Sequence, residues 1–150
     1  MRSPEFWDRW FLGLAKYIAT ASKDPSTQTG AVIVDPLRRV VSVGYNGFPK
    51  RIDDRNDRLT NREMKYKMVV HCEVNAILFA NRPLQGCVLY TWPFGSCAPC
   101  TSIVLQTGMT RVVAPVAPPE ILERWGDDLA LSSTLFREAG VIQTIVKNFS

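Results

Sequence analysis

Two short motifs that carry metal-ligand residue types constrain this 150-residue chain most strongly. The first is His71-Cys72-Glu73, and the second is Cys97-Ala98-Pro99-Cys100, which begins 26 residues after His71. Together they supply an imidazole, two thiols at C-x-x-C spacing and a carboxylate beside the imidazole, which are the components of a zinc site that activates water. Because the chain has a single histidine, any chemistry that needs an imidazole must use His71.

Four cysteines could in principle form two disulfides, but the rest of the sequence favours metal binding. Charged residues interrupt the N-terminus (Arg2, Glu5, Asp8 and Arg9), so it does not resemble a secretory signal, and we expect a cytoplasmic protein whose thiols stay reduced. No stretch approaches the roughly 20 apolar residues of a membrane span. The length, with 46% hydrophobic and 21% charged residues, predicts one globular domain over residues 1–150.

The order of predicted elements indicates an α/β fold. Apolar spacing and turn residues predict helices over 4–21, 72–81, 98–106 and 119–139, and strands over 31–34, 40–44, 87–92, 111–114 and 141–146. The first two strands are close enough to form a hairpin. The sequence therefore predicts a three-layer α/β/α domain with a mixed five-stranded sheet that begins with a hairpin.

This order also explains how the two motifs could meet. A helix of about ten residues runs roughly 15 Å away from His71, and a strand of about six residues returns roughly 20 Å. At the start of the next helix, Cys97 and Cys100 would share one face, where the helix dipole favours thiolates. Residues two apart point to nearly opposite sides of a helix, so His71 and Glu73 can share a site only if His71 lies at the very start of its helix. We predict that it does.

Three protein ligands leave the fourth zinc position open for water, which is typical of a catalytic site. The alternative is a closed structural site with Cys72 or Cys87 as fourth ligand, although both are more simply interpreted as buried small apolar residues. Glu73 is either a solvated first-turn carboxylate or a proton shuttle beside a metal-bound water. Asn46 lies in a Gly-Tyr-Asn-Gly segment. Asparagine and glycine often end a strand in a turn, and that structural role alone would explain the residue.

The net charge of +4 is modest, but residues 50–67 carry seven basic and four acidic side chains. This segment is either a solvated mixed-charge loop and helix or a source of one or two cations for an anionic substrate. Acidic residues are interleaved and aromatic residues are not clustered among the basic ones, which argues against nucleic-acid binding.

The motif pair resembles the H-x-E…P-C-x-x-C signature of zinc-dependent nucleobase deaminases. Beyond it, residues 22–31, 44–49 and 63–67 are similar to the corresponding segments of deoxycytidylate (dCMP) deaminases, and the resemblance covers most of residues 5–115. It implies a cytidine-deaminase-like fold and hydrolysis of dCMP to dUMP and ammonia, which supplies dUMP for thymidylate synthesis. The alternatives are a deaminase of tRNA adenosine or of another nucleobase, and a non-catalytic, zinc-stabilised nucleotide-binding protein.

The resemblance also implies roles for individual residues and partners. His71, Cys97 and Cys100 would bind one Zn²⁺ per chain, and Glu73 would be the general acid/base. Asn46 would hydrogen-bond the sugar of the substrate. A homohexamer, activated by dCTP with Mg²⁺ and inhibited by dTTP, is the expected assembly. Further residues expected around the nucleotide are Lys23, Ser22, Arg51 and Tyr66.

The chain departs from the family pattern at two positions. Cys72 stands where alanine is common, and Ser96 stands where proline usually precedes the first cysteine of the pair. Some relatives hold a second, structural zinc, but residues 48–70 contain neither cysteine nor histidine. We therefore expect one zinc ion only.

Overall fold

A mixed five-stranded sheet with the strand order β2-β1-β3-β4-β5 forms the middle layer of the protein. The computed structural model describes residues 1–150, and its strands are β1 (Gly30–Val34), β2 (Val40–Tyr45), β3 (Val88–Trp92), β4 (Arg111–Pro115) and β5 (Ile142–Val146). Strand β1 pairs antiparallel with both β2 and β3, whereas β3, β4 and β5 run parallel. The predicted mixed sheet with an initial hairpin is confirmed.

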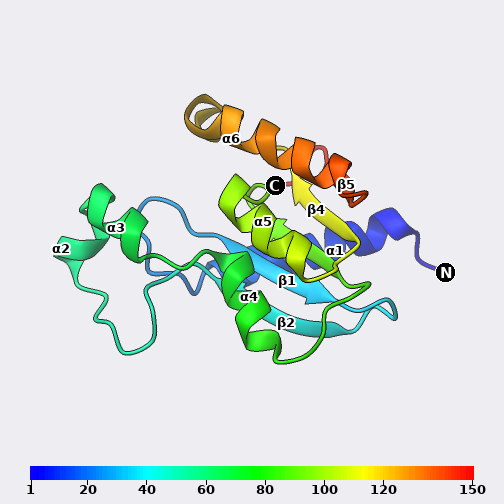
Figure 1. The fold of residues 1–150 in the computed structure, drawn as a ribbon, viewed down its shortest axis with the longest axis horizontal. Coiled ribbons are helices and arrows are strands. Elements are labelled where there is room, and N and C mark those ends of the chain that lie inside the picture. The colour runs from blue at the N-terminus through cyan, green and yellow to red at the C-terminus, as the bar shows by residue number, and fades with distance from the viewer.

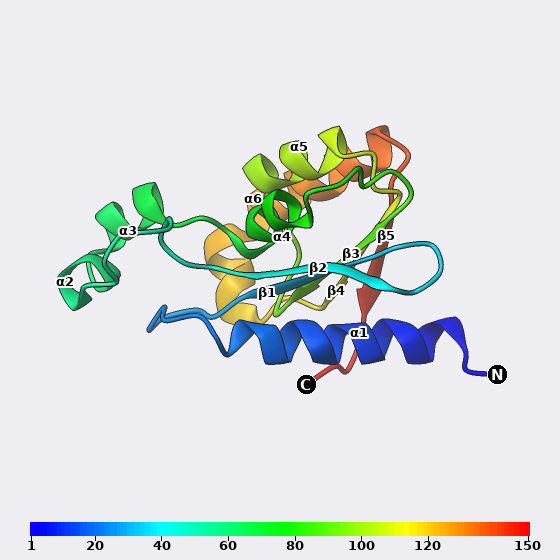
Figure 2. The same ribbon diagram turned by 90° about the horizontal axis from the view of Figure 1, so that it is seen from below.

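Helices cover both faces of this sheet (Figure 1). Figure 2 shows α1 (Pro4–Ala19) along one face and α4 (Cys72–Ala80), α5 (Ala98–Gln106) and α6 (Pro119–Glu138) over the other, which confirms the predicted three layers. Two short helices, α2 (Asn56–Leu59) and α3 (Arg62–Met68), project at one end, in the segment that the sequence predicted only as a mixed-charge loop and helix. No helix is both long and apolar enough to span a membrane.

Each face of the sheet has its own hydrophobic core, and β1 contributes to both because its side chains alternate. Val32 packs with Phe11 and Leu12 of α1. Ile33, on the other face, belongs to the core that includes Ala76 of α4 and Val104 of α5. Packing on both faces fixes the position of the central strands. The loops that follow these strands therefore start from well-defined positions.

Gly44 sets how closely α4 approaches the sheet. A Cβ atom at this position would lie 2.4 Å from the carbonyl oxygen of Cys72 and 2.5 Å from the backbone nitrogen of Ala76. Only glycine therefore allows the first turn of α4 to lie directly against β2. Just beyond β2, Gly47 and Val70 form an isolated antiparallel bridge, which brings the residue before His71 beside the end of this strand.

Candidate metal centre and cavity

His71 is the N-cap residue of α4, with extended backbone angles (φ −71°, ψ 157°). The preceding bridge holds it there through two backbone hydrogen bonds, from Gly47 to Val70 at 3.1 Å and from Val70 to Gly47 at 2.8 Å. The N-cap residue does not have helical backbone angles, so its side chain need not follow the angular spacing of side chains along the helix. His71 and Glu73 can therefore face the same space. The prediction that His71 lies at the start of its helix is confirmed.

The two thiols of the second motif come from the start of α5. Cys97 is the N-cap of that helix, and Cys100 lies in its first turn. The Nδ1 atom of His71 lies 3.1 Å from the sulfur of Cys100 and 3.4 Å from the sulfur of Cys97. All three ligand atoms lie within 4.8 Å of one another.

These three side chains fit a zinc ion. In a tetrahedral site, zinc–nitrogen bonds of about 2.0 Å and zinc–sulfur bonds of about 2.3 Å place neighbouring ligand atoms about 3.5 Å apart. The observed nitrogen–sulfur separations are close to this value, and one imidazole with two thiols is a common zinc ligand set.

The other two cysteines do not join this group. Cys72 is buried in the core around α4, where burial raises the pKa of its thiol well above the usual value. Cys87 is fully buried in the same core. With His71, Cys97 and Cys100 as the only clustered ligands, a metal ion here would keep one tetrahedral position for a ligand from outside the protein.

The environment of Cys97 favours its ionised form. Hydrogen bonding with Cys100, followed by hydrogen bonding with His71, lowers the pKa of Cys97 to about 5. The same contact with Cys97 raises the pKa of His71. The hydrogen bond between the two cysteines raises the pKa of Cys100, so Cys97 is the more acidic of the two thiols and the first to supply a thiolate, the form that binds metal ions.

Glu73 lies beside these ligands but is not one of them. Its side chain is buried, and the hydroxyl of Ser96 donates a hydrogen bond of 2.8 Å to its Oε2 atom. Burial is the main reason that the pKa of Glu73 is raised. A raised pKa brings a carboxyl group closer to the operating pH, where general acid–base catalysis is most efficient.

His71, Glu73 and Cys97 open into a cavity of about 340 Å³. Five other parts of the chain complete its walls: the loop at residues 24–29, Asn46 just after β2, helix α3, the segment before α5, and helix α6. The cavity is thus closed by elements from both ends of the sequence, with the candidate metal ligands in its wall.

Comparison with known proteins agrees with this geometry. Residues 5–116 match the family model described as the cytidine and deoxycytidylate deaminase zinc-binding region. The chain belongs to this deaminase family. Helix α6, which forms one wall of the cavity, begins just after the matched region.

Several relatives and solved structures resemble the chain. A protein described as an uncharacterised deaminase in the luxG 3′ region of Aliivibrio fischeri is 42% identical over 135 residues, which cover 90% of each chain. The deoxycytidylate deaminase of Mus musculus is 35% identical over 113 residues, 71% of this chain, and the match spans only 63% of the mouse enzyme. The dCMP deaminase of cyanophage S-TIM5, solved with dCMP and dUMP, has the same fold, with a TM-score of 0.74 at 20% identity over 97% of this chain and all of the phage chain.

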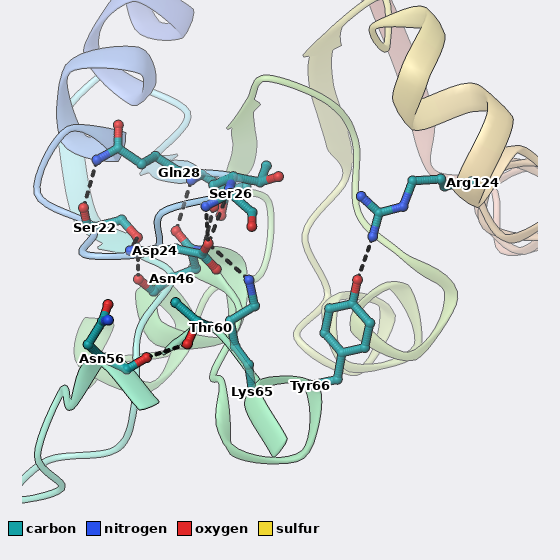
Figure 3. Close-up of polar contacts among 12 residues, drawn as sticks. Ser22, Asp24, Ser26, Gln28, Asn46, Asn56, Thr60, Lys65, Tyr66 and Arg124 are labelled. Atoms are coloured by element: carbon teal, nitrogen blue, oxygen red, sulfur yellow. Dashed lines mark hydrogen bonds and ion pairs between the residues drawn. The ribbon is translucent and has the colours of Figure 1, made fainter. Parts of the chain in front are cut away.

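Three residues expected around the nucleotide lie in or beside the cavity of this deaminase-family chain. Asn46 lines it, with Oδ1 accepting from the backbone of Thr29 and Nδ2 donating to the carbonyl of Thr27, both at 2.9 Å. Tyr66 also lines it, and its hydroxyl accepts a 2.5 Å hydrogen bond from Arg124 (Figure 3). Ser22 lies behind the lining, where it donates to the carbonyl of Asn46 at 2.9 Å.

The other two expected residues do not line the cavity. The ammonium of Lys23 forms an ion pair with Asp54 at 2.9 Å, and 70% of its side chain is exposed. Arg51 is exposed in a turn, where it has a positive φ of 67°. Lys23 lies just before the loop that lines the cavity, and its side chain turns to Asp54 instead. Arg51 lies in solvent because the chain leaves the cavity after Asn46 and returns only at α3.

The cavity instead contains cations that the sequence did not single out. Lys65 is buried and forms an ion pair with Asp24 at 3.1 Å, which ties α3 to the loop at residues 24–29 (Figure 3). Arg62 and Arg124 line the cavity from α3 and α6. Asn61, which caps α3 by accepting from the backbone of Met64, was a local signal for this helix. No local signal marked α6 as a wall of the site.

Proposed function

We propose that this protein is a hydrolase that converts dCMP and water to dUMP and ammonia. The observation that carries the proposal is that Glu73 and two of the clustered ligands, His71 and Cys97, open into one cavity that also presents arginine side chains. Relatives named deoxycytidylate deaminase, such as the mouse protein, support the choice of dCMP.

In this proposal the three ligands hold Zn²⁺, which when bound supplies a water molecule activated for attack at neutral pH. Glu73 would take one proton from the attacking water and deliver it to N3 of the cytosine. It would then pass the second proton of that water, from the new hydroxyl at C4, to the departing amine. At C4 of the ring a carbon–oxygen bond forms and the carbon–nitrogen bond breaks, which releases ammonia. The burial of Glu73 limits the access of bulk water to these proton transfers.

The remaining groups of the cavity suit a nucleotide. Asn46 uses one hydrogen of its side-chain amide on Thr27, so the second hydrogen is available for a sugar hydroxyl. Arg62 and Arg124 would bind the 5′-phosphate, since guanidinium groups pair well with phosphate oxygens. Lys65 is already neutralised by Asp24, and its role would be to shape the wall.

A substrate panel tests this function directly. Zinc-loaded protein is incubated with dCMP, deoxycytidine, CMP and an RNA hairpin, and ammonia release is measured for each. We expect the highest kcat/KM on dCMP, and loss of activity in Glu73→Gln without loss of zinc. The proposal fails if the wild-type protein releases no ammonia from dCMP, or if Glu73→Gln is as active as the wild type.

We also propose the assembly and regulation that the family resemblance implies: a cytoplasmic homohexamer, activated by dCTP with Mg²⁺ and inhibited by dTTP. Light scattering of the purified protein would give the number of subunits. Repeating the dCMP assay with each effector would show whether its rate rises with dCTP and falls with dTTP. An unchanged rate with both nucleotides would rule out this regulation.

A further inference from the structure

Ser96 links the carboxylate of Glu73 to helix α6. Its hydroxyl donates to Oε2 of Glu73 at 2.8 Å, and its carbonyl accepts a hydrogen bond of 2.8 Å from the hydroxyl of Ser132. All three side chains are buried, with exposed fractions of 6% for Ser96, 4% for Glu73 and 2% for Ser132. The contact therefore lies out of bulk water, where a hydrogen bond restrains its partners most strongly.

The terminal torsion of a glutamate side chain is broad and roughly two-fold, so the backbone alone does not fix which oxygen faces a substrate. Ser96 engages Oε2, which leaves Oε1 for proton transfer. Ser132 in turn fixes the peptide from which the Ser96 side chain extends. The H-x-E…P-C-x-x-C pattern has proline at this position, and proline has no hydroxyl, so the contact is a feature of this chain's own motif.

We propose that Ser96, held by Ser132, is a positioning residue that orients the carboxylate of Glu73 for proton transfer. This inference rests on the proposed deaminase function. It concerns the rate of the chemical step and not the retention of the metal, because Ser96 contacts none of the three candidate ligand side chains through a hydrogen bond of its hydroxyl.

The test compares Ser96→Ala with the hydroxyl-retaining Ser96→Thr, and with Ser102→Ala as a control for the same substitution on the exposed side of α5. Loss of a group that orients a functional side chain typically costs about 10- to 100-fold. We expect Ser96→Ala to lower kcat on dCMP by about that factor while KM, zinc content and Tm stay near the wild-type values. Ser96→Thr should recover most of kcat, and Ser102→Ala should not change it.

An unchanged kcat in Ser96→Ala would overturn the proposal, as would a fall in kcat that follows loss of zinc or of Tm. Crystal structures of the zinc-loaded wild type and Ser96→Ala provide a readout that needs no turnover. We expect Oε2 of Glu73 on Ser96 in the wild type and a rotated carboxylate in the variant. If the wild type does not act on dCMP, the proposed function fails, and these two structures still decide whether Ser96 orients Glu73.

Discussion

The Oδ2 atom of Asp128 in α6 accepts a 2.8 Å hydrogen bond from the backbone N–H of Ala98, the residue that follows Cys97. Cys97 is the N-cap of α5 but makes no capping hydrogen bond with its own side chain. A carboxylate from another helix therefore satisfies the first turn of α5 and places a negative charge at the positive end of its dipole. Through this contact, α6 stabilises the turn that carries both thiols.

Asp128→Ala should remove this cap. By analogy with other capping side chains, we expect the free energy of unfolding to fall by about 1 kcal/mol. The turn that holds Cys97 should also loosen, so a chelator should remove zinc faster from the variant. Urea unfolding and the rate of zinc transfer to a chelator measure the two effects. Asp127→Ala, which removes the neighbouring exposed carboxylate, should leave both near wild type.

The candidate metal centre makes a prediction that distinguishes the cysteines. Cys97→Ser and His71→Ala should lose bound zinc, because each removes one of three ligands. Cys72→Ala and Cys87→Ala should keep the wild-type zinc content, since neither side chain belongs to the ligand group. Metal analysis of the purified variants measures this. Zinc loss in either of the last two variants would favour the closed structural site.

Arg62→Ala and Arg124→Ala test the proposed phosphate contacts. Losing a hydrogen bond to a charged group costs about 1.5–3 kcal/mol, which corresponds to a fall of about 10- to 150-fold in kcat/KM for dCMP. Activity on deoxycytidine, which has no phosphate, should change much less. Lys23→Ala and Arg51→Ala are matched controls, because these cations lie outside the cavity. If the controls lose as much activity as the arginine variants, this assignment is wrong.

Asp8 anchors α1 to the sheet and gives a prediction about stability alone. This buried carboxylate accepts from the hydroxyl of Tyr90 at 3.0 Å and forms an ion pair with Arg111. Asp8→Ala leaves both partners without their acceptor, so we expect the free energy of unfolding to fall by about 3 kcal/mol. Chemical denaturation measures the change. Glu5→Ala, which breaks only the exposed pair with Arg9, should have an effect of less than about 1 kcal/mol.

Asp35 gives a pH dependence. Its carboxylate accepts from the backbone of Arg39 and Leu37 and from the Arg39 guanidinium, and these hydrogen bonds lower its pKa below 3.8. A lowered folded-state pKa stabilises the protein above the unfolded-state pKa, and this contribution is lost as the pH falls through the folded-state value. The wild type should therefore have a higher Tm than Asp35→Asn at pH 6. This difference in Tm should become smaller below pH 4. A difference that is constant over this range would contradict the prediction.

Local patterns were sufficient to predict the layers of the fold and the arrangement of the two motifs. The spacing between His71 and Glu73 required His71 at a helix start, and α4 begins at the next residue. The predicted helix over residues 98–106 is α5, with Cys97 as its N-cap. These features depend on interactions between residues that are close together in the sequence, so local sequence patterns are enough to predict them.

The walls of the cavity depend on contacts between distant segments, and the sequence did not reveal them. Lys65 is one of seven basic residues between positions 50 and 67, and its burial follows from the position of Asp24, 41 residues earlier. Likewise, Arg124 contacts Tyr66, 58 residues earlier, only because the fold brings the first half of α6 close to α3. In each case the residue type resembles that of its solvated neighbours, so only the tertiary structure identifies it.

The boundary between the matched family region, which ends at residue 116, and α6, which begins at Pro119, divides the cavity into two modules. Every candidate metal ligand and Glu73 precede this boundary, whereas Arg124, Trp125 and Asp128 follow it. A single splice point before Pro119 would therefore exchange one wall of the cavity together with Asp128 and Ser132. The reacting groups stay in place only where the incoming segment supplies the same two hydrogen bonds, to Ala98 and to Ser96. Chimeras made at this point with related deaminases offer a direct route to altered substrate preference.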